Sequence, residues 1–177
     1  MRPASETDNW RSAPAGAATS GCMPRWRAAV MALLCLAGGA AFAAPSTFGP
    51  VIGSAILCRS HLDNAFFHAY LSSAFGPSYK HEGGAYWFKA DGNLWGAPVS
   101  DILLSDDTGD VVFVGAVSSA TPDKLEEAIR AAVGVRHKAA DASAYPVRES
   151  VPGSKIVYFD TKSKIYCAKY KPLPTLR

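Results

Sequence analysis

The stretch that decides the fold is DVVFVGAV, residues 110–117. Four valines and a phenylalanine within eight residues favour an extended strand, and the lack of charge after Asp110 predicts a central position in a sheet. The turn residues Asp106-Asp107-Thr108-Gly109 precede this strand, so we expect a hairpin with the strand before it. Thr121-Pro122-Asp123 follows as an N-cap, a first-turn proline and a first-turn acid, which predicts a helix that ends at Gly134.

An earlier helix is predicted from His61 to Phe75, with Ser60 as its N-cap. Gly76-Pro77 supplies the signal that ends it. Apolar residues recur at helical spacing and predict its buried stripe: Leu62, Phe66, Phe67, Tyr70, Leu71 and Ala74. The opposite face carries His61, Asn64, His68 and Ser72, and its two histidines are predicted to be exposed to solvent.

Further strands are expected on both sides of the second helix. In the first half they are Tyr86–Ala90 and Leu94–Ser105, joined by a turn at Asp91-Gly92-Asn93. In the second half they are Tyr145–Glu149, Lys155–Asp160 and Lys164–Lys171, after a small-residue loop at Ala139–Ala144. An extended lead-in is expected at Phe48–Gly53, because it carries glycine and proline.

This order, α-β-β-β-α-β-β-β, predicts an α+β fold of two layers. The short connections imply a largely antiparallel sheet, and the two helices are expected to cover one of its faces. The two halves share their order of elements but not their residues, so the sequence only weakly suggests an internal duplication.

The first part of the chain has the pattern of a secretory signal peptide. Arg25 and Arg27 precede a short apolar run at 28–37, and Ala41-Phe42-Ala43 forms a small-residue cleavage site. We expect cleavage after Ala43, so that residues 1–43 are an N-terminal extension with the signal and residues 44–177 are one mature domain. The alternatives are a retained membrane anchor and a true start at Met23 instead of Met1.

Two of the four cysteines lie in this leader, which leaves Cys58 and Cys167. A single remaining pair in an exported chain predicts a disulfide between them. The alternative is a catalytic Cys58 with a nearby histidine, but the residues around it supply no oxyanion-hole motif.

The net charge of the whole chain is +3, and much of that excess belongs to the leader. From residue 44 onward there are 14 basic and 13 acidic residues, a net charge of +1. Acids concentrate in residues 82–127 and bases in residues 155–177, which either pair across strands or present a basic face to an anionic partner. The near-neutral mature chain and the lack of a binding motif argue against nucleic acid.

Known catalytic motifs are absent from the sequence: it contains no G-x-S-x-G, S-x-x-K, H-E-x-x-H or Walker loop. No cysteine and histidine set has the spacing of a metal site, and Asp106, Asp107 and Asp110 lack the ligand order of an EF-hand. We therefore predict no metal and no cofactor.

Two regions carry candidate site residues. The loop Gly76–Gly84 brings Lys80, His81 and Glu82 between flexible glycines, and these three are the candidates for catalysis. Candidate binding residues are the aromatic Tyr79, Trp87 and Trp95. Adjacent residues in a strand point to opposite faces, so part of the aromatic set around Trp87 is expected to face solvent. The alternative is that helices and loops cover both faces.

The sequence thus predicts a small binding or inhibitor-like protein that is exported to a periplasm or cell surface. Its partner would be a protein or a small molecule of the cell envelope, and no membrane span is expected after cleavage. One alternative is an accessory component of an envelope assembly that docks through the Lys155–Arg177 region. The other is a small hydrolase built on Lys80, His81 and Glu82. Whether the chain is an enzyme, and its oligomeric state, are left open.

Overall fold

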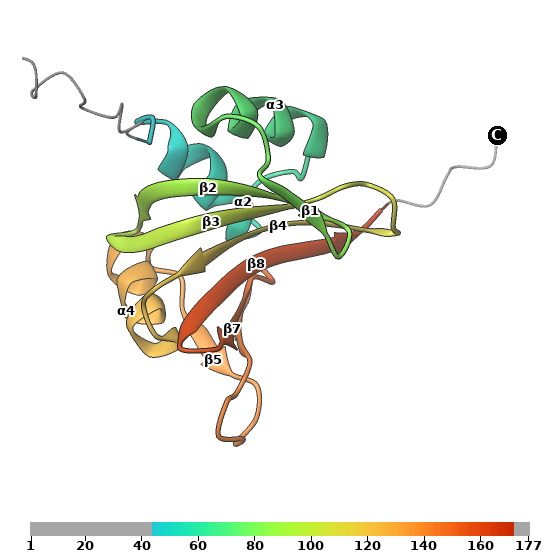
Figure 1. Ribbon diagram of the computed structural model, residues 1–177. Coiled ribbons are helices and arrows are strands. Elements are labelled where there is room, and N and C mark those ends of the chain that lie inside the picture. Colours follow the sequence, from blue (N-terminus) through green and yellow to red (C-terminus); the bar gives the residue numbers. More distant parts are fainter. Residues whose placement is uncertain (1–43, 172–177) are drawn as a thin grey trace, which may run out of the picture. The chain divides into compact units, whose positions relative to one another are not determined.

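The computed structural model describes residues 44–171, so the predictions on residues 1–43 lie outside the described residues. Figure 1 shows the helices and strands of this part of the chain. The helices are η2 (Gly49–Gly53), α2 (Ser54–Ile56), α3 (Asn64–Phe75) and α4 (Pro122–Val133). The strands are β1 (Lys80–Glu82), β2 (Ala85–Leu94), β3 (Ala97–Ser105), β4 (Val111–Ser118), β5 (His137–Ala139), β6 (Arg148–Ser150), β7 (Lys155–Phe159) and β8 (Lys162–Tyr170).

The strands form a single antiparallel sheet in the order β1-β2-β3-β4-β8-β7-β6-β5. Each half of the sheet is a meander of four consecutive strands, the first preceded by α3 and the second by α4. The two halves join where β4 pairs with β8, from Val111 opposite Tyr170 to Ser118 opposite Ser163. The predicted α+β class and antiparallel pairing are confirmed, but the prediction of three strands in each half is wrong.

All helices of residues 44–171 pack on one face of this sheet. Contacts join α3 to β2 and β3, α2 to β4 and β8, and α4 to β7 and β8. One apolar cluster holds the buried side chains of this layer, including Ile52, Leu71, Phe88, Leu125 and Ile165. Alternate residues of each strand therefore face this core, and the residues between them lie on the opposite face, which no helix in the described part covers.

The expected extended lead-in at Phe48–Gly53 is wrong, because this segment continues as the helical pair η2 and α2. Pro50 lies at its start, where a helix tolerates proline. Ile52, Ala55 and Ile56 are fully buried against the middle of the sheet. A short helix that is apolar all round lacks the amphipathic period by which helices are recognised in a sequence.

Helix α3 begins later than predicted, at Asn64 instead of His61. Its N-cap is Asp63, whose carboxylate accepts a hydrogen bond from the Phe66 N–H at 3.0 Å, and not Ser60. The helix ends at Gly76 as predicted. Of its expected buried stripe, Phe67 and Leu71 are in the core, whereas Phe66 is 51% exposed.

Helix α4 follows the prediction closely. It begins at Pro122 after the N-cap Thr121 and ends at Gly134, whose φ of 72° is the left-handed conformation of a helix C-cap. Asp123 in the first turn and Arg130 in the last turn complement the helix dipole.

The predicted turn at Asp91-Gly92-Asn93 is wrong, because these residues continue β2 past a bulge. The chain reverses at Trp95 and Gly96, whose φ angles of 56° and 84° match a two-residue type I′ turn. At Gly92 an added Cβ would come within 3.1 Å of the Ala44 Cβ and 3.3 Å of the Phe48 ring. Gly92 therefore allows β2 to pack closely against the residues at the start of η2. Local turn preferences cannot predict a contact of this kind.

Short strands were missed at both edges of the sheet. Strand β1 lies inside the predicted loop Gly76–Gly84, and β5 takes the first residue of the predicted loop Ala139–Ala144. Each is three residues long, so its sequence pattern is too short to distinguish a strand from a loop.

The predicted disulfide between Cys58 and Cys167 is confirmed. Cys58 follows α2 and Cys167 lies in β8 with its side chain in the core, so the bond ties the buried helical pair to the middle of the sheet. The two cysteines are 109 residues apart in the sequence.

Gly115 allows β4 and β8 to approach closely at the centre of the sheet. A Cβ at this position would lie 2.9 Å from the Ile165 carbonyl oxygen and 3.0 Å from the Tyr166 Cβ. Because the nearest atom belongs to the backbone of the paired strand, it cannot move aside without disturbing the ladder.

No helix of residues 44–171 has both the length and the hydropathy that a membrane crossing requires.

Loss of the disulfide is expected to lower the free energy of unfolding by about 2–5 kcal/mol, because the unfolded chain is released from a long closed loop. Urea unfolding of the Cys58→Ser/Cys167→Ser double variant measures this. A reductant should destabilise the native chain similarly and leave the double variant unchanged. A native chain that is indifferent to reductant would contradict the disulfide.

Gly115→Ala is expected to lower the free energy of unfolding by about 1–3 kcal/mol, through the steric conflict with β8. Gly109→Ala is the matched control, because a Cβ there meets nothing closer than the Val111 nitrogen at 4.0 Å. Equal unfolding midpoints for the two variants in urea would show that β4 and β8 are not so closely apposed.

Candidate functional site

A cavity of about 550 Å³ opens on the sheet face that carries no helix. Its lining comes from β1, β2, β3, β4, β7 and β8 and is mainly apolar and aromatic: Lys80, Glu82, Gly83, Ala85, Trp87, Leu103, Phe113, Gly115, Phe159, Lys164, Tyr166 and Ala168. Its volume lies in the range of sites for small organic molecules.

Strand register brings the lining together from distant parts of the sequence. Trp87 lies opposite Leu103, Leu103 opposite Gly115, and Gly115 opposite Tyr166, so these four form one row across β2, β3, β4 and β8. Gly115 has no side chain, which leaves a hollow between its larger neighbours. Phe88, the next residue after Trp87, is fully buried on the other face, as strand alternation requires.

Two lysines hold their charged groups over the aromatic rings of the cavity. The Lys164 Nζ lies 4.2 Å from the centre of the Phe159 ring and 5.3 Å from that of Trp87. The Lys80 Nζ lies 5.2 Å from the centre of the Trp87 ring. These distances are those of cation–π contacts, in which an amine is attracted to the ring face. Burial lowers the pKa of the Lys164 amine below its usual value.

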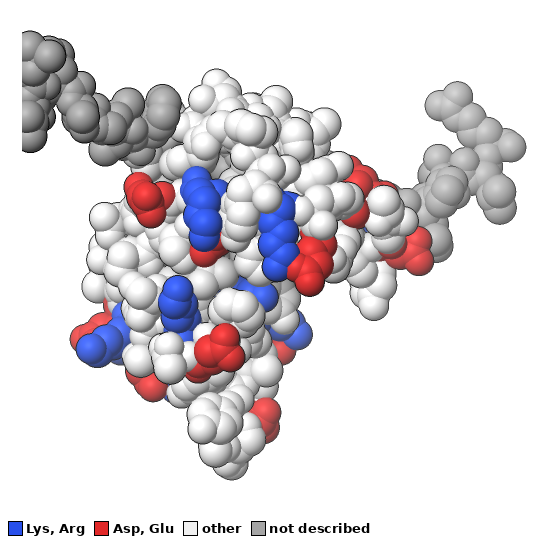
Figure 2. All heavy atoms as spheres, in the orientation of Figure 1, with Lys and Arg blue, Asp and Glu red and all other residues white. Residues whose placement is uncertain are grey.

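Ion pairs join most of the other charges on this sheet face. Lys80 pairs with Glu82 on β1, and Lys89 pairs with Asp101 across β2 and β3 at 2.7 Å. Farther along, Lys155 pairs with Glu149 at 2.7 Å. In the view of Figure 2, basic and acidic side chains alternate and neither sign forms a continuous patch. Within residues 44–171, one ion pair, between Lys171 and Asp107, joins the acidic segment 82–127 to the basic segment 155–177.

A polar cluster around Asp101 adjoins the cavity. Its carboxylate accepts hydrogen bonds from the Tyr79 hydroxyl at 2.9 Å, from the Lys89 amine at 2.7 Å and from the Ser100 hydroxyl at 2.7 Å. Burial alone would raise the pKa of Asp101, but these donors outweigh it and hold the pKa below its usual value. Burial, followed by the hydrogen bond to Asp101, raises the pKa of Tyr79.

The three candidate catalytic residues are divided between two environments. Lys80 and Glu82 line the cavity, whereas His81 between them contacts Tyr86 and Asp106. The His81 Nε2 lies 2.7 Å from the Asp106 Oδ2, and its ring stacks on Tyr86 with the ring centres 4.6 Å apart. Hydrogen bonds from Thr108, and then from His81, lower the pKa of Asp106 to about 2. The histidine is therefore paired with a carboxylate outside the cavity.

The predicted binding residues are also separated. Trp87 lines the cavity and Tyr79 lies in the adjoining cluster, but Trp95 packs beside Gly53 against the core. Sequence reasoning missed Phe113, Phe159, Lys164 and Tyr166. Alternation in β4 and β8 was the available signal, since Phe113 and Tyr166 are neighbours of the core residues Val114 and Ile165.

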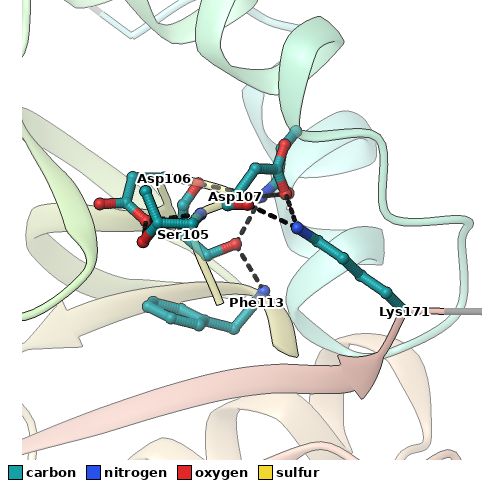
Figure 3. Close-up of polar contacts among 7 residues, drawn as sticks. Ser105, Asp106, Asp107, Phe113 and Lys171 are labelled. Carbon is teal, nitrogen blue, oxygen red and sulfur yellow. Dashed lines mark hydrogen bonds and ion pairs between the residues drawn. The ribbon is translucent and has the colours of Figure 1, made fainter. Parts of the chain in front are cut away.

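A second polar cluster ties α3 to the turn between β3 and β4. The Asn64 amide donates to the Ser105 carbonyl at 2.9 Å and the Asp107 carboxylate at 3.0 Å, and it also contacts the Ser105 hydroxyl. That hydroxyl accepts from the Phe113 N–H at 2.9 Å, and Lys171 lies 3.7 Å from the Asp107 carboxylate, as drawn in Figure 3. Asn64, which the sequence places on the helix face opposite the apolar stripe, is buried at the start of α3 against this turn.

The predicted exposure of His68, which lies on the same helix face as Asn64, is wrong. This histidine is half-buried, and its ring packs edge-on against Tyr86 with the ring centres 4.8 Å apart. Both residues contribute to a shallow pocket between α3 and the strands, together with Ala65, Ala69, Leu104 and Ser105.

His137 is a buried titratable residue away from the cavity. It lies in β5 and is 4% exposed, and its Nε2 is 2.9 Å from the Ser154 hydroxyl, which in turn contacts Ser150 at 2.7 Å. Its Nδ1 has no hydrogen-bond partner. Burial lowers the pKa of this imidazole to about 4, so it is neutral in the folded protein at neutral pH.

Within residues 44–171, no three histidine, cysteine, aspartate or glutamate side chains gather closely enough to hold a metal ion.

Acidification from about pH 7 to about pH 5 is expected to lower the free energy of unfolding by about 2 kcal/mol through His137. The unfolded imidazole takes up a proton as the pH falls through its usual pKa near 6.5, whereas the folded one resists until about 4. Urea unfolding at both pH values should show a smaller loss for His137→Gln. The exposed-histidine variant His61→Gln should retain the full loss, and equal losses in both variants would contradict this assignment.

Comparison with protein-family models, with curated proteins and with solved structures finds no match to this chain.

Proposed function

We propose that this is an exported binding protein that takes a small organic ligand with an apolar body in the cavity on the open face of its sheet. The observation that carries the proposal is the aromatic lining of that cavity. Trp87, Phe113, Phe159 and Tyr166 converge there from four strands, on the face that the helices of residues 44–171 leave uncovered.

Apolar burial supplies the driving force for such binding. Covering an aromatic side chain on a strand removes apolar surface from water, which is favourable. A ligand that displaces water from several rings gains binding free energy from each of them. The opposite sheet face already has its cover from the helices and forms the core. The open face has comparable rings without such cover, which favours an external partner.

The disulfide supports the proposed export of the protein. A bond between Cys58 and Cys167 in the core persists in an oxidising compartment and is rare in the cytosol. Together with the leader expected from the sequence, this supports action in a periplasm or outside the cell. The alternatives of an envelope-assembly component and of a hydrolase at His81 stay predictions. The envelope-assembly alternative uses the basic Lys155–Arg177 region for docking. The described part of this region forms two inner strands of the sheet, β7 and β8, and not a sheet edge.

The neutral fluorescent probe N-phenyl-1-naphthylamine tests the proposal directly. We expect saturable fluorescence enhancement with one probe per chain, because its rings match the apolar lining. Ala168→Trp should weaken probe binding at least about fivefold, since this exposed cavity residue would place an indole in the space.

Ala139→Trp is the matched control, because Ala139 is also an exposed strand alanine but lies in β5, outside the cavity. It should bind the probe as the native chain does. Thermal unfolding of both variants verifies that they fold. Absence of saturable binding, or equal binding by the two tryptophan variants, would refute the cavity as a ligand site.

A further inference from the structure

Lys164 is the feature of the cavity that the apolar proposal leaves unexplained. It is the third residue of β8, which lies between β4 and β7, and it is opposite Val117 on one side and Val157 on the other. Its amine is half-buried over Phe159 and Trp87. Within residues 44–171 it forms no ion pair with a carboxylate.

The carboxylates that share this sheet face are already engaged. Glu82 pairs with Lys80, Asp101 with Lys89, and Glu149 with Lys155. Asp101 is further occupied by the hydroxyls of Tyr79 and Ser100. The cavity therefore holds one amine whose charge is offset by ring faces alone, in surroundings that are otherwise apolar.

We infer that the cavity binds an organic monoanion with an aromatic body, whose carboxylate or sulfonate group pairs with the Lys164 amine. This inference rests on the proposed binding function and specifies the ligand's charge. The apolar lining matches the body of such a ligand, and a single free amine matches a single negative charge.

The energetics favour an anion over a neutral ligand. A partly desolvated amine without a counter-ion is costly, and the effect is seen in the lowered pKa of Lys164. An incoming anion would provide the missing partner in a medium where charge pairing is stronger than in water. A polyanion is disfavoured, because the other lysine of the lining, Lys80, is already paired with Glu82.

The experiment uses two probes with one scaffold. 8-Anilinonaphthalene-1-sulfonate is N-phenyl-1-naphthylamine with an added sulfonate, so the ratio of their affinities isolates the contribution of the charge. We expect the native chain to bind the sulfonate about tenfold more tightly than the neutral probe. Lys164→Met retains an apolar stem without the charge, and it should remove this preference, so that the two probes bind about equally.

Two further variants sharpen the test. Lys162→Met is the matched control, because Lys162 is exposed two residues earlier on the same strand and does not line the cavity. It should keep the preference for the sulfonate, and Lys164→Arg should largely keep it because the charge is retained. Thermal unfolding of Lys164→Met and Lys162→Met verifies that both variants fold.

The outcomes separate the two proposals. If neither probe binds, the proposed binding function fails and this inference fails with it. If the neutral probe binds and the sulfonate binds no better, or if Lys164→Met and Lys162→Met lose the preference equally, the cavity binds ligands but Lys164 does not select anions. Loss of the preference in Lys164→Met alone supports the inference.

Discussion

The pairing of β4 with β8 is the constraint on which the rest of this structure depends. It is the single join between two four-strand meanders, and it runs from Val111 to Ser118 without interruption. Gly115 permits the close approach of the two strands, and Cys167 in β8 carries the disulfide to Cys58. Because side chains alternate in direction along a strand, β4 and β8 contribute residues both to the core on one face of the sheet and to the cavity on the other.

The two faces of the sheet differ in how their side chains are covered. The helical face is closed by η2 and α2 at its centre, which bury Ile52 and Ile56 completely and hold the disulfide partner. On the open face, ion pairs join most of the charges. No helix of residues 44–171 covers the rings around Trp87, and the Lys164 amine contacts ring faces instead of a carboxylate. The proposed anionic ligand would give the Lys164 amine a counter-ion in addition to its contacts with the rings of Phe159 and Trp87.

Local sequence patterns predicted a good part of the fold. Helix α4 and the turn before β4 were correctly placed because their capping and turn residues act within a few positions of the chain. The turn assigned to Asp91-Gly92-Asn93 failed because Gly92 is needed for contact with Phe48, more than forty residues away in the sequence. Among the candidate site residues, Trp87 was found but Phe113 and Tyr166 were not, since each belongs to a strand whose neighbours become known only from the register.

The sequence by itself determined the class of fold, the antiparallel pairing and the identity of the disulfide, because these follow from periodicity, short connections and the count of cysteines. Only the tertiary structure decided which residues share the cavity and which share the core. Whether Lys164 meets a carboxylate or an aromatic ring depends on which strands lie beside β8, and this order is set by packing across the whole sheet. Side chains that are far apart along the chain become one site through strand register, which no local pattern encodes.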